Sequence, residues 1–441
     1  MKKDKHLLKL IQASRIIDLC YGYRQRVSGI PALAVGVIYK DQVILAKGYG
    51  QADPETCYRI ASISKTFTAI AVLQLVETGK LNLDDKVSSH LAWFSSTIDS
   101  RIQEITIRQL LAHTSGLTRD GDTIHWIKEP FPDLNHIKKY ISGLKLPFSP
   151  DERWKYSNLG YSIIGAVIEQ VSGKPYEEYL QENICKPLGM TSTSSILSQH
   201  IETHLATGYG RKIMEKEREV FPNIETNAMA GATGLSSNVH DLLKFVAAQF
   251  TGNTKLLSDT SKKEMRRIQK YVKKDDIKQA LSYRTCKVDS RTIYYHSGGF
   301  QGFRCNISFD IGRNIGIVTL ANVLGFDPKN YAETAFNIIN YFYINSPGED
   351  QPNLQKYEGI YRDIWGDSAV AAIGDTLVTF SPNAFSPLSH AAILKPVGNN
   401  VFEIVGGDEE ENAGELAYFD LDKDGKGRKV RWGATYAEII K

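Results

Sequence analysis

Ser62 and Lys65 are the two residues whose types and spacing suggest covalent chemistry. They lie in the run Ala61-Ser62-Ile63-Ser64-Lys65-Thr66, which opens an apolar segment that predicts a buried helix. Because residues three apart share one face of a helix, we expect the Lys65 amine beside the Ser62 hydroxyl. A serine needs a neighbouring base to become a nucleophile, and burial lowers the pKa of a lysine. The helix start also supplies N–H groups where an oxyanion would form.

The S-x-x-K spacing alone is not specific, because the chain repeats it at Ser142-Gly143-Leu144-Lys145. There the serine follows a predicted helix, and Gly143 and Pro147 prevent a new helix from placing the lysine one turn on. We therefore interpret Ser142 as part of a helix end and loop.

A second motif, Tyr156-Ser157-Asn158, precedes a predicted helix at about 159–171. A phenol can shuttle a proton when a nearby lysine lowers its pKa, so Tyr156 is a candidate acid or base. The amide of Asn158 is expected on the same side, where it would hold the lysine or the substrate. The same spacing at Tyr343-Ile344-Asn345 ends a helix, and we expect no function there.

A third motif, His296-Ser297-Gly298-Gly299, is expected at the end of a strand. Gly298 and Gly299 would let a substrate approach the backbone closely, as binding at a sheet edge requires. The N–H of Gly299 is expected to complete an oxyanion hole with that of Ser62.

The elements that must position these motifs alternate between helix and strand patterns. Helical spacing at 5–28 is followed by a β-hairpin at 32–39 and 42–48; three strands lie between 292 and 320, and a helix follows at 328–342. This order predicts an α/β fold class, in which an antiparallel sheet flanked by helices forms a sandwich and an all-helical lobe is inserted.

The predicted first domain covers residues 1–345. Its sheet lobe is expected at about 1–80 and 230–345, and its helical lobe at about 81–229. Such a domain is larger than usual because the inserted lobe interrupts the sheet.

A polar linker at 346–353 separates this domain from a second one at 354–441. The second domain has short strands divided by turn signals at Gly374-Asp375 and Gly398-Asn399. We predict a small all-β barrel there.

The order S-x-x-K, Y-x-N, H-x-G resembles the serine β-lactamase and penicillin-binding-protein superfamily. Within it, the chain looks most like the class C β-lactamase-like serine hydrolases, which include esterases and D-aminopeptidase-like peptidases. The resemblance covers most of residues 10–345 and includes four further segments: Leu110 to Leu117, Gly173 to Tyr176, Pro187 to Met190 and Gly231 to Ser237. Tyr357 to Tyr361 resembles the start of the lipocalin-like β-domains often appended to such hydrolases. That domain would restrict the cleft or mediate oligomers, and the sequence leaves both open.

The resemblance implies a role for each motif residue. Ser62 would form an acyl-enzyme, while Lys65 and Tyr156 would share the general-base and general-acid steps as one titrating unit. Which of the two takes the serine proton stays open. Asn158 would orient Lys65 and bind the substrate amide. His296 stands where many relatives carry the lysine of K-T-G, and it would act electrostatically or hydrogen-bond to Tyr156.

The histidine at this position affects the expected substrate. A lysine's permanent charge helps to bind the carboxylate of β-lactams, whereas histidine is charged only partly at neutral pH. We therefore expect a peptidase, amidase or esterase acting on a small molecule or short peptide, with β-lactams as weak acylators. No metal and no organic cofactor is expected. Two alternatives stay open: a penicillin-binding protein with slow turnover, and a non-catalytic binding or scaffold protein that retains the fold.

Composition and the N-terminal segment exclude several other classes of protein. Lys and Arg sum to 53 against 50 Asp and Glu among 441 residues, which excludes the clustered basic excess of a nucleic-acid-binding protein. The five cysteines form no C-x-x-C pair. The N-terminal segment resembles an amphipathic helix rather than a secretory signal, and no apolar stretch has the ~18 residues of a membrane span. We expect a cytoplasmic protein without membrane contact, or a periplasmic or secreted one if a signal was removed, and homo-oligomer formation stays open.

Overall fold

The computed structural model describes residues 4–440 except 128, 215, 273–276 and 407–411. The chain divides into two compact units. The first, here the sheet unit, is Ile30–Ala332. The second, here the barrel unit, joins Met1–Gly29 to Glu333–Lys441.

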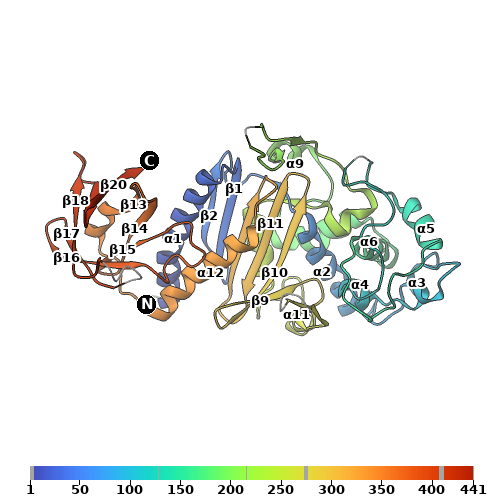
Figure 1. The fold of residues 1–441 in the computed structure, drawn as a ribbon. Coiled ribbons are helices and arrows are strands. Elements are labelled where there is room, and N and C mark those ends of the chain that lie inside the picture. Colours follow the sequence, from blue (N-terminus) through green and yellow to red (C-terminus); the bar gives the residue numbers. More distant parts are fainter. Residues whose placement is uncertain (1–3, 128, 215, 273–276, 407–411, 441) are drawn as a thin grey trace. The chain divides into compact units, whose positions relative to one another are not determined.

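An eight-stranded antiparallel sheet forms the centre of the sheet unit, with strand order β2-β1-β12-β11-β10-β9-β8-β7. Strands from the start of the chain lie beside strands from near residue 300 (Figure 1). The bounds are β1 (Ala32–Tyr39), β2 (Gln42–Gly50), β7 (Lys270–Val272), β8 (Ile277–Gln279), β9 (Arg284–Val288), β10 (Arg291–Phe300), β11 (Phe303–Asp310) and β12 (Ile315–Ala321). All residues of β1 and β12 are buried, which explains their nearly continuous apolar sequences. The predicted hairpin and antiparallel sheet are confirmed.

Helix α2 (Ser64–Glu77) follows a single 3₁₀ turn, η1 (Ala61–Ile63), and is buried on nearly all sides. A helix this apolar all around belongs in a core, and Phe67 stacks on Phe245 at a centroid distance of 3.7 Å. Phe245 belongs to α10 (Val239–Ala247), which packs against β1 and β12. The start of α2 is thereby fixed relative to the sheet.

The inserted lobe is mainly helical, as predicted, but it also contains a two-stranded sheet of β4 (Gly208–Tyr209) and β5 (Val220–Phe221). Tyr209 also pairs with the chain just after β12, because its N–H donates to Asn322 O at 3.0 Å. Its helices are α3 (Val87–His90), α4 (Ile107–Leu111), α5 (Leu134–Ser142), α6 (Asn158–Ser172), α7 (Tyr176–Leu180), α8 (Lys186–Leu188) and α9 (Gln199–His204), with η2 (Ser100–Glu104), η3 (Gln181–Cys185) and η4 (Asn227–Met229).

Three further elements complete the sheet unit. The short strands β3 (Tyr58–Arg59) and β6 (Ser236–Ser237) pair with each other. They hold the chain just before Ser62 against the glycine-rich turn η5 (Ala230–Gly234). Helix α11 (Asp259–Arg266) precedes β7.

The barrel unit contains α1 (Lys5–Val27), most of α12 (Pro328–Asn345), the turn η6 (Pro352–Tyr357) and a closed eight-stranded barrel. Consecutive strands pair antiparallel, and β13 closes on β20. The bounds are β13 (Gly359–Arg362), β14 (Asp367–Ile373), β15 (Thr376–Phe380), β16 (Ala392–Gly398), β17 (Val401–Ile404), β18 (Leu416–Leu421), β19 (Gly427–Trp432) and β20 (Thr435–Ile440). The predicted small barrel is confirmed.

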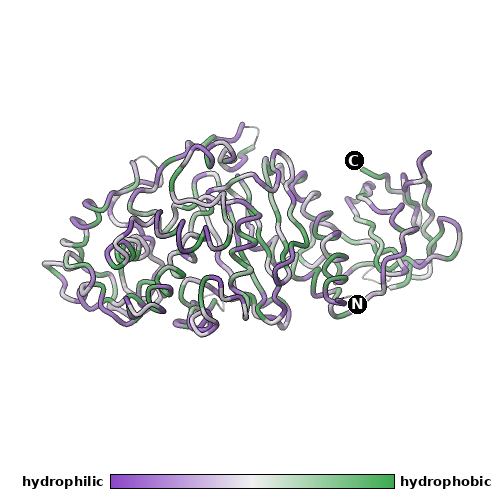
Figure 2. The backbone as a smooth tube through the Cα atoms, turned by 180° about the vertical axis from the view of Figure 1, so that it is seen from behind, coloured by the Kyte–Doolittle hydropathy of each residue, from purple (hydrophilic) through white to green (hydrophobic). Residues whose placement is uncertain are grey.

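Hydropathy along the backbone follows these elements, with hydrophobic stretches in the interior strands and hydrophilic ones in many loops (Figure 2). The two compact units divide the chain differently from the predicted domains 1–345 and 354–441, which stay a prediction. Helix α1 groups with the barrel because Gln12 Nε2 donates to Asp350 Oδ1 at 2.7 Å and Tyr23 Oη donates to Asp367 Oδ2 at 2.9 Å. None of the helices in the described ranges is long and apolar enough to span a membrane.

Candidate active site

Lys65 and Ser62 contact each other at the start of α2. Lys65 Nζ lies 3.1 Å from Ser62 Oγ, and it donates to Asn158 Oδ1 and to Ala232 O, both at 2.7 Å. The lysine is fully buried, with an exposed fraction of 0%. Burial lowers the pKa of Lys65, and the opposing effects of Tyr156 and Asp120 do not restore it. Lys65 thus has the position expected from the S-x-x-K spacing.

Tyr156 lies over the same amine, with its ring centroid 5.0 Å from Lys65 Nζ. Burial by itself raises the pKa of the Tyr156 phenol, but the charge of Lys65, hydrogen bonds with Ser62 and Lys65, and the charge of Arg284 together bring it below its ordinary value. The phenolate form of Tyr156 is therefore favoured more than in a free tyrosine. Ser62, Lys65 and Tyr156 form one hydrogen-bonded cluster.

Arg284, on β9, is a member of this cluster that the sequence motifs do not reveal. Its guanidinium carbon lies 5.3 Å from the Tyr156 ring centroid and 5.1 Å from that of Trp154. Gln279 Oε1 accepts hydrogen bonds from both Arg284 Nε and Trp154 Nε1. The site thus contains a permanent positive charge beside the phenol. No local spacing could have found it, because it reaches the site only through the pairing of β9 with β10.

Asn158, the first residue of α6, is held from both ends of its amide. Its Oδ1 accepts from Lys65 Nζ, and its Nδ2 donates to Asp120 Oδ1 at 2.6 Å. Ser157 caps the helix by accepting from the N–H of Gly160 at 2.9 Å. Because a carboxylate can only accept, Asp120 keeps the amide nitrogen on its own side and so leaves the amide oxygen facing Lys65. Asp120 was also missed in the sequence.

The segment 111–120 contacts all three residues of the Y-x-N motif and holds them in place. His113 Nδ1 accepts from the N–H of Ser157 at 3.2 Å, and the His113 ring lies 4.2 Å from that of Tyr156. The N–H of Asn158 donates to Arg119 O at 2.7 Å. Burial first, and then the charges of Lys65, Arg284 and His296, lower the pKa of His113 far below its usual range. His113 is therefore a neutral supporting residue.

His296 lies in the middle of β10 rather than at a strand end, because the strand continues to Phe300. Its Nδ1 donates to Ser297 O at 2.9 Å, and its Nε2 is buried with no hydrogen-bond partner among the described residues. Burial, followed by the charges of Arg284 and Lys65, lowers the pKa of His296 well below its usual range. His296 is therefore neutral at neutral pH, and its free acceptor Nε2 is not bonded to Tyr156.

The two glycines after His296 have different neighbours. A Cβ at Gly298 would lie 2.1 Å from Ile60 O, whereas one at Gly299 would meet the mobile end of Arg304 at 2.8 Å. Ile60 leads directly into Ala61, which has a left-handed φ of 51°, and into Ser62. Gly298 thus makes room for the turn that carries Ser62. Ser297, Gly298 and Gly299 also line a cavity of 410 Å³.

Comparisons with known sequences support a single family. A profile of the family described as Beta-lactamase matches residues 23–337. Protein flp of Staphylococcus aureus (strain COL) is 29% identical over 322 residues, which cover 71% of this chain and 64% of that protein. PbpX of Bacillus subtilis (strain 168), described as a candidate penicillin-binding protein, is 31% identical over 275 residues, covering 60% of this chain and 64% of that protein. The matched part of the chain thus spans 64% of the length of these curated relatives.

Solved structures share the fold. The octameric penicillin-binding protein homologue from Pyrococcus abyssi has a TM-score of 0.64 at 22% identity and covers 96% of this chain and 98% of its own. EstCE1, a hydrolase with promiscuous acyltransferase activity, has a TM-score of 0.64 at 20% identity over 75% of this chain and 98% of its own. The class C β-lactamase from Rhodobacter sphaeroides has a TM-score of 0.62 at 20% identity over 75% of this chain and 99% of its own. Because the family profile covers the whole sheet unit, in which the predicted motifs lie, the chain belongs to the Beta-lactamase family.

Proposed function

We propose that this chain is a serine hydrolase that cleaves an amide or ester bond through an acyl-enzyme on Ser62. The observation that carries the proposal is the set of partners around Lys65 Nζ. Asn158 Oδ1 and Ala232 O can only accept, so they take two N–H bonds of the amine. In a neutral Lys65 the lone pair then lies on the remaining side of the amine, which faces Ser62 Oγ and Tyr156. Burial favours this neutral form, so Ser62 has a base in contact with it.

The same cluster supports a complete reaction cycle. Ser62 Oγ attacks the substrate carbonyl carbon while its proton passes to the Lys65–Tyr156 pair. The tetrahedral intermediate then expels the amine or alcohol, which takes that proton, and leaves an ester on Ser62. A water molecule loses a proton to the pair and attacks this ester, which releases the acid and returns the proton to Ser62. Which member of the pair receives the first proton stays open.

Two features bear on the substrate. His296 is neutral and cannot replace the permanent charge of a lysine, so a substrate carboxylate would depend on Arg284, whose charge lies beside Tyr156. We therefore propose peptidase, amidase or esterase activity on a small molecule or short peptide, with β-lactams as weak acylators.

The Pyrococcus abyssi homologue is octameric, and we propose that this chain also forms homo-oligomers, which light scattering would test.

Covalent labelling tests the role of Ser62. A fluorophosphonate probe should add one label to the native chain by intact-mass measurement and none to Ser62→Ala. Ser142→Ala is a matched control, because Ser142 belongs to the second S-x-x-K and lies exposed at the end of α5. Full labelling of Ser62→Ala would refute the assignment.

A penicillin-binding protein with slow turnover is the second candidate, and the likeness to penicillin-binding protein homologues supports it. Stopped-flow hydrolysis of a p-nitrophenyl ester separates the candidates. A hydrolase gives a burst followed by steady turnover, whereas a slow-turnover protein gives the burst alone. A non-catalytic binding protein gives neither.

A further inference from the structure

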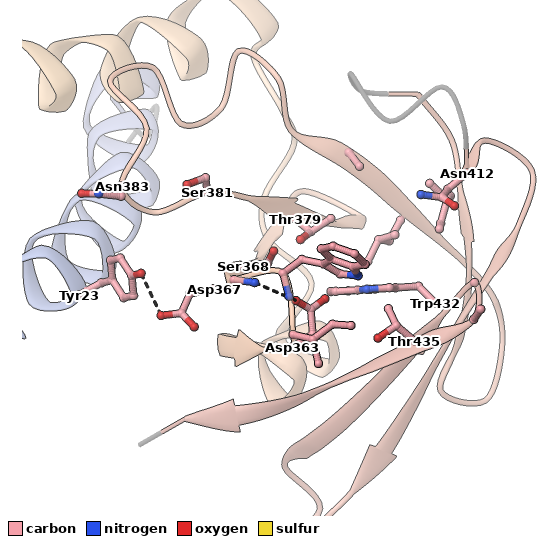
Figure 3. A pocket seen from close by; sticks show the side chains of 18 residues that line it. Tyr23, Asp363, Asp367, Ser368, Thr379, Ser381, Asn383, Asn412, Trp432 and Thr435 are labelled. Carbon is pink, nitrogen blue, oxygen red and sulfur yellow. Dashed lines mark hydrogen bonds between the residues drawn. The ribbon is translucent and has the colours of Figure 1, made fainter. Parts of the chain in front are cut away.

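A cavity of 880 Å³ opens at one end of the barrel, within the barrel unit (Figure 3). Its described lining comes from Tyr23 of α1, the β13–β14 loop, the end of β15 and the chain after it, the start of β16, the end of β17, Asn412 and the β19–β20 turn. None of the motif residues lines it. Its size lies in the range of small-molecule sites, and eight-stranded barrels of other proteins hold one small ligand.

The wall of this cavity is partly aromatic and aliphatic. Leu394 and Ile404 belong to the buried barrel core behind the cavity, and Trp432 packs partly against that core and is half-buried. Ile364 and Trp365, at the rim, are 83% and 84% exposed. Such exposure of two large apolar side chains beside a hollow is typical of a binding surface.

The charged side chains in the described lining of the cavity are all negative. Its described lining contains the carboxylates of Asp363 and Asp367 but no lysine, arginine or histidine. Asp367 is already paired, because Arg362 donates to both of its oxygens at 2.6 and 2.7 Å. Asp363 has no ion pair within the described part of the chain, and its Oδ1 accepts from the N–H groups of Trp365 and Gly366 at 2.7 and 3.0 Å. One uncompensated negative charge thus lies beside the indole rings.

We propose that this cavity binds a small organic cation, namely an ammonium group attached to an aromatic or other apolar body. The ammonium would pair with Asp363 and contact an indole face, while the apolar part would cover the exposed surface of Trp432 and Ile364. An anionic ligand would meet like charge, and a purely apolar ligand would desolvate the Asp363 carboxylate without a partner. This site is separate from Ser62 and does not depend on the proposed hydrolysis.

Three probes with one carbon skeleton test the charge preference by calorimetric titration of the full chain: 2-phenylethylammonium, 2-phenylethanol and phenylacetate. We expect single-site binding of the ammonium, about tenfold tighter than the alcohol, and no binding of phenylacetate. Asp363→Asn keeps an oxygen acceptor for the two backbone N–H groups but removes the charge. It should reduce the ammonium to the affinity of the alcohol and leave the alcohol unchanged.

Two further variants locate the site. Asp375→Asn removes an equal charge from the β14–β15 turn, at the other end of β14 from the cavity, and should change nothing. Trp432→Leu should weaken both the ammonium and the alcohol. The proposal is wrong if the ammonium does not saturate, if it binds no better than the alcohol, or if Asp363→Asn and Asp375→Asn behave alike. Unchanged alcohol binding by Asp363→Asn shows that the cavity is intact in that variant.

Discussion

Two positive groups lie beside Tyr156, and one of them, Arg284, is outside all three motifs. Lys65 and, to a smaller extent, Arg284 lower the pKa of Tyr156. Replacing Arg284 with Gln should therefore raise the pKa of Tyr156 and move formation of the phenolate to higher pH.

The pH dependence of kcat/KM for a neutral ester measures this change. In Arg284→Gln, the limb that reports Tyr156 deprotonation should shift to higher pH, with a lower rate below it and recovery above it. A neutral ester is used so that lost substrate binding does not imitate the effect. An unshifted profile would show that Arg284 does not contribute to the lowered pKa of Tyr156.

Asp120 is a positioning residue, because it holds the Asn158 amide that contacts Lys65. Asp120→Ala removes the acceptor for Asn158 Nδ2 and frees the amide to rotate, so acylation should slow by about tenfold or more. Asp120→Asn keeps an oxygen acceptor and should retain most of the rate. Removing the carboxylate should also lower the pKa of Lys65 in both variants, since Asp120 raises it.

The measurement is the rate of fluorophosphonate labelling as a function of pH. Equal rates in Asp120→Ala and Asp120→Asn would mean that the hydrogen bond does not position Asn158.

Much of this cluster was predicted from local sequence. The helical spacing of Ser62 and Lys65 and the N-terminal position of Asn158 on a helix follow from short-range patterns. Arg284 and Asp120 could not be predicted in the same way. Their contacts depend on strand pairing and on a loop that meets the chain 38 residues later.

At the scale of elements, Gly298 lets strand β10 pack directly against the turn that carries Ser62. Gly298→Ala would drive a Cβ against Ile60 O, a backbone atom that cannot move independently of Ala61 and Ser62. We expect a loss of about 1–3 kcal/mol in stability together with slower labelling.

Gly299→Ala is the control for this third prediction, because its Cβ meets only the flexible end of Arg304. Thermal unfolding and fluorophosphonate labelling should show this variant close to the native chain. Equal behaviour of the two alanine variants would refute the packing role of Gly298.

Periodicity predicted most elements, since hairpin, helix and strand signals are local. The periodicity predicted a strand end at His296, because the glycines that follow interrupt the pattern. The strand β10 in fact continues to Phe300. The periodicity also missed β9 (Arg284–Val288), and β7 and β8, which are three residues each and too short to show a period.

At the scale of the whole molecule, the sequence did not show that α1 belongs with the barrel. Arg24 of α1 is buried in the barrel unit, with an exposed fraction of 3%. It donates to Pro382 O at 3.1 Å, Ala384 O at 2.5 Å and Thr334 Oγ1 at 3.1 Å. Polar contacts over such separations leave no periodic signal in the chain.

Arg24→Met, the fourth prediction, should leave these carbonyls without a charged donor and lower stability by about 1–3 kcal/mol. Chemical denaturation followed by circular dichroism measures the loss. The neighbouring Arg26→Met, at an exposed position, should have little effect. A native-like Arg24→Met would show that the hydrogen bonds of Arg24 do not contribute to holding α1 in the barrel unit.

The pairing of β1 with β12 also determines when the site can form during synthesis. Residues 32–39 have no strand partner on that side until residues 315–321 have left the ribosome. Until then, β1 exposes apolar side chains on both faces, and we expect nascent chains to need chaperone protection during this interval. The serine cluster is therefore among the last parts of the protein to assemble, so a chain truncated before residue 321 cannot form the site.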